Sequence, residues 1–376
     1  MCQTGKVISR RAFLSLPAAA GFATVACRRN RGGDGFRGYA FVANEEGQAI
    51  AAVDLEVMAV ARHIPVAGNP SVVLSSPTRP FVYALTKENG TIHEVAVEHM
   101  ALARKLTVAS AAESFHVSPD GASLYVLATE PRSLIRVALD SFQVDWKLPL
   151  SENAAAFALS SDGKTAAITS ATSVRMVDLD ARKLREPSGT GDFGEVRFLA
   201  DAKTLIVADR GERRLSLYDA ASSQLITHLP LLVRPDHLCF NADGGQMFVT
   251  GEGADAVVVV YPYHTPEVAE TVLAGHTPGP MAASQQLLFV ANPGSGDVSI
   301  LQINARKLIA VVSVGSDPGF ITVTPDDQYA LVLNRKSGDI SVLRVGTITK
   351  NRDRRASLLT VIPVGSKPVS AVVRAV

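Results

Sequence analysis

Two groups of polar residues in this sequence have the types needed to bind or transform a ligand. The first is the segment DRGERR, in which Asp209 is followed by Arg210, Arg213 and Arg214. Forked guanidinium groups bind carboxylates through paired hydrogen bonds, so three arginines on one loop could clamp an acidic ligand. A solvated, charged surface loop is the alternative interpretation of the same segment.

The second group consists of polar residues inside stretches that otherwise read as apolar β-strands. These stretches are SFHVSP, GEVRFL and PDHLCF, and their polar residues are His116, Glu195, Arg197, Asp236, His237 and Cys239. Glu195 and Arg197 are two residues apart, so their side chains project from the same face of a strand. The group forms either an internal ion pair with hydrogen-bonded imidazoles or a ligand-binding site at the mouth of a channel.

Other chemical motifs are weak or missing. SGTGDFGEV has glycines in dinucleotide-binding spacing at 189, 191 and 194, but a strand follows where that motif needs a helix, so we expect a loop. His93 and His99 are six residues apart, about 20 Å along a strand, which is too far to share one metal ion. No HExxH, GxSxG, CxxC or CxxCH occurs. No metal site, nucleophile elbow or c-type haem attachment is therefore expected, and no cofactor is evident.

The elements that must position these residues come from a repeat. Equivalent strand ends fall 40 to 42 residues apart, at positions 54, 96, 138, 178, 219, 261, 302 and 344. A period this regular predicts a propeller or a solenoid. Segments such as FITVT, LLFVAN and DVSIL alternate, are rich in β-branched residues and are bounded by Gly, Pro, Asn or Asp. Each copy therefore predicts four short strands, which make one propeller blade.

The two ends of the repeat region predict how the ring closes. The first copy begins with its second strand at YAFVAN, and KPVSAVVRAV at the C-terminus corresponds to a first strand. The C-terminal strand would complete the first blade and leave no free edge. We therefore expect an all-β, eight-bladed β-propeller of four-stranded blades over residues 39–376, with seven blades as the alternative. Its recurring Asp-Gly pairs are interpreted as hairpin turns.

Three segments show a family resemblance. PGFITVTPDDQYALVLNRKSGDISVLRV, LLFVANPGSGDVSILQINARKLIAVVSVG and SFHVSPDGASLYVLAT resemble YVTN-family β-propeller repeats. The resemblance covers roughly residues 39–376, is best in the last two copies and is weak at 182–204. Related propellers include haem-binding nitrite reductase domains and sugar lactonases. The resemblance implies the propeller fold far more firmly than any activity.

The N-terminus resembles an export signal. SRRAFL places Arg10 and Arg11 before a short apolar run, as in bacterial twin-arginine signals, and the run ends at TVAC like a lipobox. We expect a signal peptide at 1–26 and a tether at 27–38 that begins with lipidated Cys27. Thr24 stands where a lipobox usually has Leu, so cleavage after Ala26 to give a soluble periplasmic protein is the alternative.

Composition narrows the functional classes. A formal charge of +1 argues against a nucleic-acid binder. We expect an exported, membrane-anchored propeller, periplasmic or on the cell surface, that acts as a non-catalytic binding or scaffolding module. Its partner would be an envelope protein or a small ligand on the face that carries the Gly-x-x-Pro turns. The alternatives are a ligand-handling propeller related to haem or redox proteins and a lactonase-type hydrolase.

Overall fold

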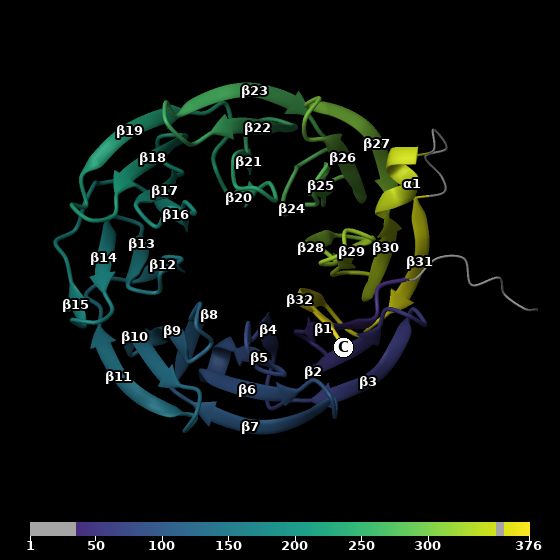
Figure 1. The fold of residues 1–376 in the computed structure, drawn as a ribbon, viewed down its shortest axis with the longest axis horizontal. Coiled ribbons are helices and arrows are strands. Elements are labelled where there is room, and N and C mark those ends of the chain that lie inside the picture. The colour runs from purple at the N-terminus through teal and green to yellow at the C-terminus, as the bar shows by residue number, and fades with distance from the viewer. Residues whose placement is uncertain (1–34, 351–356) are drawn as a thin grey trace, which may run out of the picture. The chain divides into compact units, whose positions relative to one another are not determined.

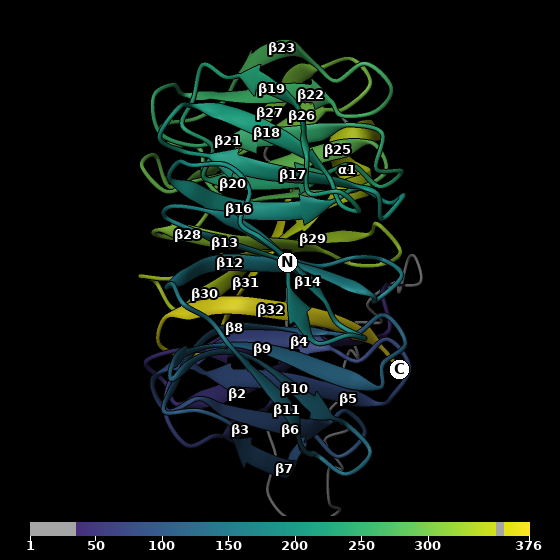
Figure 2. The ribbon, with the colours of Figure 1, turned by 90° about the vertical axis from the view of Figure 1, so that its left-hand side faces the viewer.

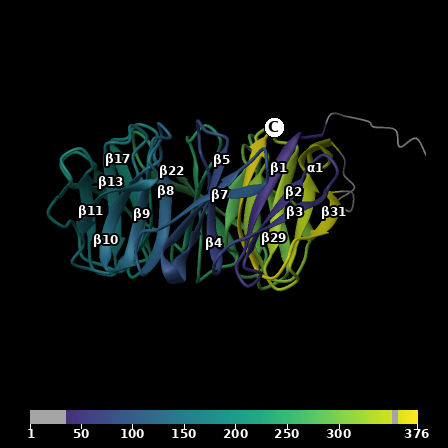
Figure 3. The ribbon, with the colours of Figure 1, turned by 90° about the horizontal axis from the view of Figure 1, so that it is seen from below.

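A computed structural model describes residues 35–350 and 357–376 of the chain. The expected signal peptide and Cys27 lie outside the described residues. Eight antiparallel four-stranded sheets, blades A to H, surround a central axis (Figure 1). Their strands run between the two faces of the ring, as the views from the side show (Figures 2 and 3).

Within each blade the strands follow one another from the axis outward. Blade A consists of β32 (Pro368–Ala375), β1 (Gly38–Asn44), β2 (Ala49–Asp54) and β3 (Ala59–Pro65). Blade B consists of β4 (Pro70–Ser75), β5 (Phe81–Thr86), β6 (Thr91–Ala96) and β7 (Ala101–Thr107), with the short 3-10 helix η1 (Lys87–Asn89) after β5. Blade C consists of β8 (Ala111–Val117), β9 (Ser123–Glu130), β10 (Arg132–Ala138) and β11 (Gln143–Pro149). Blade D consists of β12 (Ala154–Leu159), β13 (Thr165–Ser170), β14 (Val174–Asp178) and β15 (Lys183–Leu184).

The other four blades have the same order of strands. Blade E consists of β16 (Phe193–Phe198), β17 (Thr204–Asp209), β18 (Arg214–Asp219) and β19 (Leu225–Pro230). Blade F consists of β20 (His237–Phe240), β21 (Met247–Thr250), β22 (Ala256–Tyr261) and β23 (Glu267–Leu273). Blade G consists of β24 (Met281–Ala283), β25 (Leu287–Asn292), β26 (Asp297–Gln302) and β27 (Lys307–Ser313). Blade H consists of β28 (Pro318–Val323), β29 (Tyr329–Asn334), β30 (Asp339–Arg344) and β31 (Leu358–Pro363), with α1 (Val345–Lys350) after β30.

The ring closes in blade A, where the two ends of the repeat region meet. β32 pairs antiparallel with β1, from Gly38 opposite Ala375 to Asn44 opposite Pro368. This confirms the predicted closure and the count of eight blades, and the seven-bladed alternative is wrong. Closure matters because an unpaired inner strand would leave an exposed sheet edge.

The hydrophobic core is divided among the interfaces between blades. In the described residues, each of the eight neighbouring pairs of blades shares one apolar cluster. In β29, Leu331 and Leu333 pack towards blade A, whereas Ala330 and Val332 pack towards blade G. Second strands such as YALVLN are therefore apolar on both faces, since each face meets a different neighbour.

A buried polar residue ends the second strand of seven blades. Asn44, Asn292 and Asn334 are each at most 1% exposed, and their side-chain amides donate to groups of the adjoining turns. Asn44 donates to the Val364 carbonyl, whereas Asn292 and Asn334 donate to the side chains of Asp297 and Asp339. In blade F the second strand ends at Thr250, and the Thr250 hydroxyl donates to the Gly279 carbonyl at 2.7 Å.

Glycines of the Gly-x-x-Pro turns cover these asparagines. A Cβ added to Gly275 would lie 2.6 Å from Asn292 Cγ and 2.8 Å from Asp297 Oδ1. A Cβ on Gly315 would lie 2.7 Å from the side chain of Asn334. Real Cβ atoms do not approach other heavy atoms so closely, so the turn requires glycine.

The predicted hairpin turns are confirmed at the Asp-Gly pairs. Asp120 Oδ1 accepts the Ala122 amide at 2.9 Å, and Gly121 has φ of +67°. Asp162 and Asp326 make the same contact with the amide two residues later, at 3.1 Å each. These carboxylates stabilise turns by side-chain to backbone hydrogen bonds, which accounts for their recurrence.

Blade D departs from the repeat. Its outer strand β15 has two residues, and the chain then follows β14 irregularly, with backbone hydrogen bonds from Arg185 to Met176 and between Ser188 and Val174, before it reaches blade E. Arg185 Nη1 donates to the carbonyls of Ala220 and Ala221 at 2.7 and 2.8 Å, and Ser188 Oγ donates to that of Ser223 at 2.8 Å. This irregularity explains the weak repeat signal at 182–204. No helix in the described residues is long and apolar enough to span a membrane.

Candidate functional site

The upper face carries the loops between successive blades and between the second and third strands of each blade. In four blades an ion pair links the loop before the innermost strand to the loop after the second strand, at equivalent positions of the repeat. Asp192 pairs with Arg210 at 2.8 Å in blade E, and Asp317 pairs with Arg335 at 2.7 Å in blade H. The charges are reversed in blade A, where Lys367 pairs with Glu45 at 2.6 Å, and in blade F, where Arg234 pairs with Glu252 at 3.4 Å. These pairs hold the upper loops in place.

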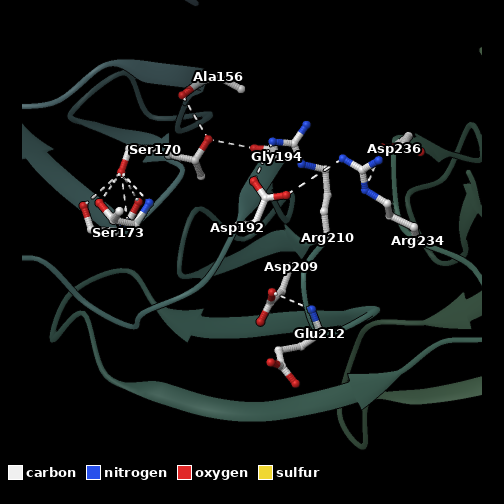
Figure 4. A network of polar contacts seen from close by, with 12 residues as sticks. Ala156, Ser170, Ser173, Asp192, Gly194, Asp209, Arg210, Glu212, Arg234 and Asp236 are labelled. Atoms are coloured by element: carbon white, nitrogen blue, oxygen red, sulfur yellow. Dashed lines mark hydrogen bonds and ion pairs between the residues drawn. The ribbon is translucent and has the colours of Figure 1, made fainter. Parts of the chain in front are cut away.

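Asp192 also connects two blades. It lies between the guanidinium groups of Arg210 and Arg234 (Figure 4), with Arg234 Nη2 at 3.8 Å from Asp192 Oδ2. Arg234 in turn approaches Asp236 Oδ1 at 3.9 Å. Asp236, predicted as a ligand-binding residue, thus belongs to a chain of alternating charges.

The arginines of DRGERR do not form a three-armed clamp. Arg210 is paired with Asp192, and Arg214 Nε donates to Oδ2 of fully buried Asp209 at 2.8 Å. Only Arg213 is without an ion-pair partner among the described residues, and its side chain lies near Gly253 of blade F. Two of the three arginines therefore stabilise the loop that carries them.

Glu195 and Arg197 form an ion pair on the innermost strand of blade E. Glu195 Oε2 also accepts the Leu238 amide of blade F at 2.9 Å. His116 hydrogen-bonds the Phe157 carbonyl through Nε2 at 2.9 Å, and burial lowers the pKa of its imidazole to about 4. Glu195 and Arg197 thus form an ion pair, and the His116 imidazole is hydrogen-bonded. This is the first of the two interpretations given for these residues in the sequence analysis.

His237 and Cys239 lie on the innermost strand of blade F. Burial lowers the pKa of His237, so its imidazole is neutral at pH 7, and its ring has no hydrogen-bond partner in the described part of the chain. Burial raises the pKa of the Cys239 thiol to about 12, which keeps it protonated and unreactive. His237 is therefore the predicted axial residue whose imidazole remains available to a ligand.

A cavity of about 670 Å³ opens on the upper face at His237. Its lining comes from blades F, G and H, and we call it the F–G–H pocket. The lining residues are Asp236, His237, Gly251, Glu252, Gly253, Ala254, Asp255, His276, Thr277, Pro278, Gly279, Pro280, Pro293, Gly319 and Arg335. Ligand pockets of small molecules occupy about 300–1,000 Å³, so the cavity is large enough for one.

A histidine–aspartate pair stands in the wall of this pocket. His276 Nδ1 lies 3.0 Å from Asp255 Oδ2, and Asp255 Oδ1 accepts the Thr277 amide at 2.9 Å. The hydrogen bond from His276 lowers the pKa of the Asp255 carboxyl. Both residues are exposed. The sequence alone did not identify Asp255 and His276, because they are 21 residues apart on two different loops. The one sequence feature that could have suggested them is that both loops belong to the upper face of the propeller.

Two predicted residues, Asp236 and His237, thus reach the F–G–H pocket, whereas His116, Glu195, Arg197, Asp209, Arg210, Arg213 and Arg214 are absent from its lining. No group of three metal-ligating side chains occurs in the described residues.

Residues 39–361 match a protein-family model described as "Lactonase, 7-bladed beta-propeller". The chain belongs to this family. Its eight blades exceed the seven of the family's description. No curated protein matches the sequence significantly.

Several solved structures share the fold of this lactonase-family protein. Dihydro-heme d1 dehydrogenase NirN, in complex with DHE, superposes with a TM-score of 0.76 at 12% identity, covering 93% of this chain and 78% of that chain. Apo AztD from Citrobacter koseri gives 0.67 at 14% identity, covering 89% and 98%. Kuenenia stuttgartiensis hydrazine synthase gives 0.58 at 19% identity, covering 73% and 95%. At these identities the likeness establishes the fold alone.

Proposed function

We propose that this protein is an exported binding module that holds a small, hydroxyl-rich molecule in the F–G–H pocket. The observation that carries the proposal is the mixed lining of that pocket. Asp236, Glu252 and Asp255 supply acceptors, while His237, His276 and Arg335 supply donors. A ligand with many hydroxyl groups both donates and accepts hydrogen bonds, and the prolines of the lining offer an apolar surface to its carbon skeleton.

The carboxylates that line the pocket favour a hydroxyl-rich ligand over haem, which carries two carboxylate groups. Three carboxylates line the cavity, and its single arginine is already paired with Asp317. Haem propionates would bring further negative charge to this lining. Although the NirN structure holds DHE, the residues of the F–G–H pocket do not suit a tetrapyrrole, and we expect purified protein to show no visible absorbance band.

Titration calorimetry with two neutral polyhydroxyl probes, glucose and sorbitol, tests the proposal. Either probe should bind in a saturable way, and Asp255→Asn should weaken binding about tenfold because one charged hydrogen-bond acceptor is lost. Tyr125→Phe, in blade C and outside the pocket, is the matched control and should bind normally. Absence of binding by both probes, or equal binding by Asp255→Asn, would refute the proposal.

Lactone hydrolysis is a second candidate, favoured by the pairing of His276 with Asp255 in a lactonase-family chain. With Asp255 holding Nδ1, His276 Nε2 could take a proton from water. The water oxygen would attack the lactone carbonyl, the ring C–O bond would break, and the ring oxygen would receive the proton. Gluconolactone opening faster than its spontaneous rate, lost in His276→Gln, would support this candidate.

The location of the protein is part of the same proposal. The segment SRRAFL and the TVAC run support export and lipid attachment at Cys27, with a soluble periplasmic form as the alternative. Cys27→Ser should move the protein from the membrane to the soluble fraction of an osmotic-shock extract. Continued membrane association of that variant would contradict the lipid anchor.

A further inference from the structure

A second cavity, of about 400 Å³, lies between blades D and E, far along the chain from the pocket described above. We call it the D–E pocket. Its lining residues are Ser188, Gly189, Thr190, Phe193, Arg214, Tyr218, Ser223, Leu225 and His228. Its lining includes residues of two motifs that are absent from the lining of the F–G–H pocket: the glycine-rich SGTG and the last arginine of DRGERR.

The pocket lies where the outer strand of blade D becomes irregular after β15. Arg214, Ser216 and Tyr218 alternate along β18, and Tyr218 packs in the apolar cluster that blade E shares with blade D. Residues 185 and 188 keep backbone hydrogen bonds to β14 of blade D, while their side chains reach blade E through the Ser188–Ser223 and Arg185–Ala220 hydrogen bonds.

Comparison of the repeats shows that this lining is specific to blade E. The residue before the end of the third strand is Tyr218 in blade E and an aliphatic residue in the other seven blades: Val53, Val95, Val137, Val177, Val260, Leu301 and Leu343. A Cβ added to Gly189, which has φ of +72°, would lie 2.5 Å from the Tyr218 hydroxyl. Glycine at 189 thus keeps the loop close to that hydroxyl.

The chemistry of the lining is dominated by hydrogen-bond donors. Arg214 uses Nε to bind Asp209, and its two Nη groups have no partner among the described residues. His228 contacts Ser216 Oγ through Nδ1 at 3.0 Å, which leaves Nε2 available. The backbone amides of Gly189, Thr190 and Gly191 donate to no protein group in the described part of the chain. Ser223 Oγ is buried without a partner.

No aspartate or glutamate lines the D–E pocket. The nearby carboxylate of Asp209 is fully buried and is already bound by Arg214 Nε and by the Glu212 amide at 3.3 Å. We propose that the D–E pocket binds a small molecule through an oxyanion group, by the Arg214 guanidinium, the Tyr218 and Ser223 hydroxyls, His228 and the amides of the SGTG loop. Forked guanidinium groups and clustered backbone amides are the donors that recognise such groups.

The test is a calorimetric titration of the full-length protein with inorganic phosphate, sulfate and acetate in separate experiments. At least one anion should bind, and Tyr218→Phe and His228→Leu should each weaken that binding about tenfold. Similar binding of phosphate and sulfate would identify a tetrahedral oxyanion as the ligand group, and stronger binding of acetate would identify a carboxylate. Tyr125→Phe is the matched control, and it should bind like the unmodified protein.

The proposal is separable from that for the F–G–H pocket. Asp255→Asn should leave anion binding at the D–E pocket unchanged. The proposal is overturned if none of the three anions binds, if both Tyr218→Phe and His228→Leu bind normally, or if Asp255→Asn removes the binding.

Discussion

Asp317 and Arg335 form an ion pair of 2.7 Å between the turn that precedes β28 and the residue that follows β29. Lys367 and Glu45 form the same pair in the next blade with the charges exchanged. The loop geometry therefore accommodates an ion pair at the two positions with either order of charge. Since the Gly319 backbone leaves room for Arg335, the arginine lies flat against the inner strand.

The first prediction exchanges these charges. Asp317→Lys should destabilise the protein by about 1 kcal/mol, because it places two cations together in a partly exposed pair. Adding Arg335→Glu should recover most of that loss, as blade A already uses this arrangement. Urea unfolding measures both effects, with Glu56→Lys on an exposed turn as the control. A double variant no more stable than Asp317→Lys alone would show that the pairing is not interchangeable.

The second prediction concerns ring closure. Removal of residues 367–376 deletes β32, the innermost strand of blade A, and exposes the edge of β1. The truncated protein should lose its single cooperative thermal transition, because the interfaces of blade A with blades B and H are both opened. Removal of Val376 alone, which is 77% exposed, should leave the transition unchanged. An unaltered melt after the larger deletion would contradict closure through β32.

The third prediction concerns the Gly-x-x-Pro turns. Gly275→Ala should cost about 2 kcal/mol, because the new methyl group overlaps Asn292 and its bonded partner Asp297. Gly346→Ala is the control, since no atom of the residues that the structure describes lies within 4 Å of the Cβ it would add. Chemical denaturation of the two variants compares the costs, and equal stability would remove the packing explanation for these glycines.

Much of this architecture could be predicted from the sequence, for a physical reason. Strands such as LLFVAN and YALVLN must bury both faces, and only a ring of blades stacked side by side does this for every copy. The repeat failed locally at 182–204, where β15 shrinks to two residues and its replacement is fixed by contacts with blade E. Those contacts join residues about 35 positions apart, and no local pattern encodes them.

The candidate site was less predictable. Asp236 and His237 were found because polar residues are unusual in innermost strands, and both reach the F–G–H pocket. Asp255 and His276 lie on loops, where charged residues are ordinary, so their types carried no signal. Arg210 and Arg214 looked available as a clamp because their partners, Asp192 and Asp209, are identified only by the folded loops.

The fourth prediction concerns His116, whose burial lowers the pKa from 6.5 to about 4. The unfolded chain takes up a proton near pH 6.5, whereas the folded protein resists protonation until about pH 4. The contribution of His116 to stability is therefore complete above pH 6.5 and is lost as the pH falls towards 4. An NMR titration of the His116 ring should give a pKa near 4. Titration of His116 near 6.5 would contradict its burial.

The most direct test of the central claim is to locate the ligand on the protein. Hydrogen–deuterium exchange with and without saturating glucose, a neutral probe, should show slower exchange with glucose in the loops at 251–255 and 274–280, which line the F–G–H pocket. It should leave the amides at 188–191 unchanged. Protection confined to those two loops is the result we predict; no protection there, or protection only at 188–191, would contradict the assignment of the F–G–H pocket as the binding site.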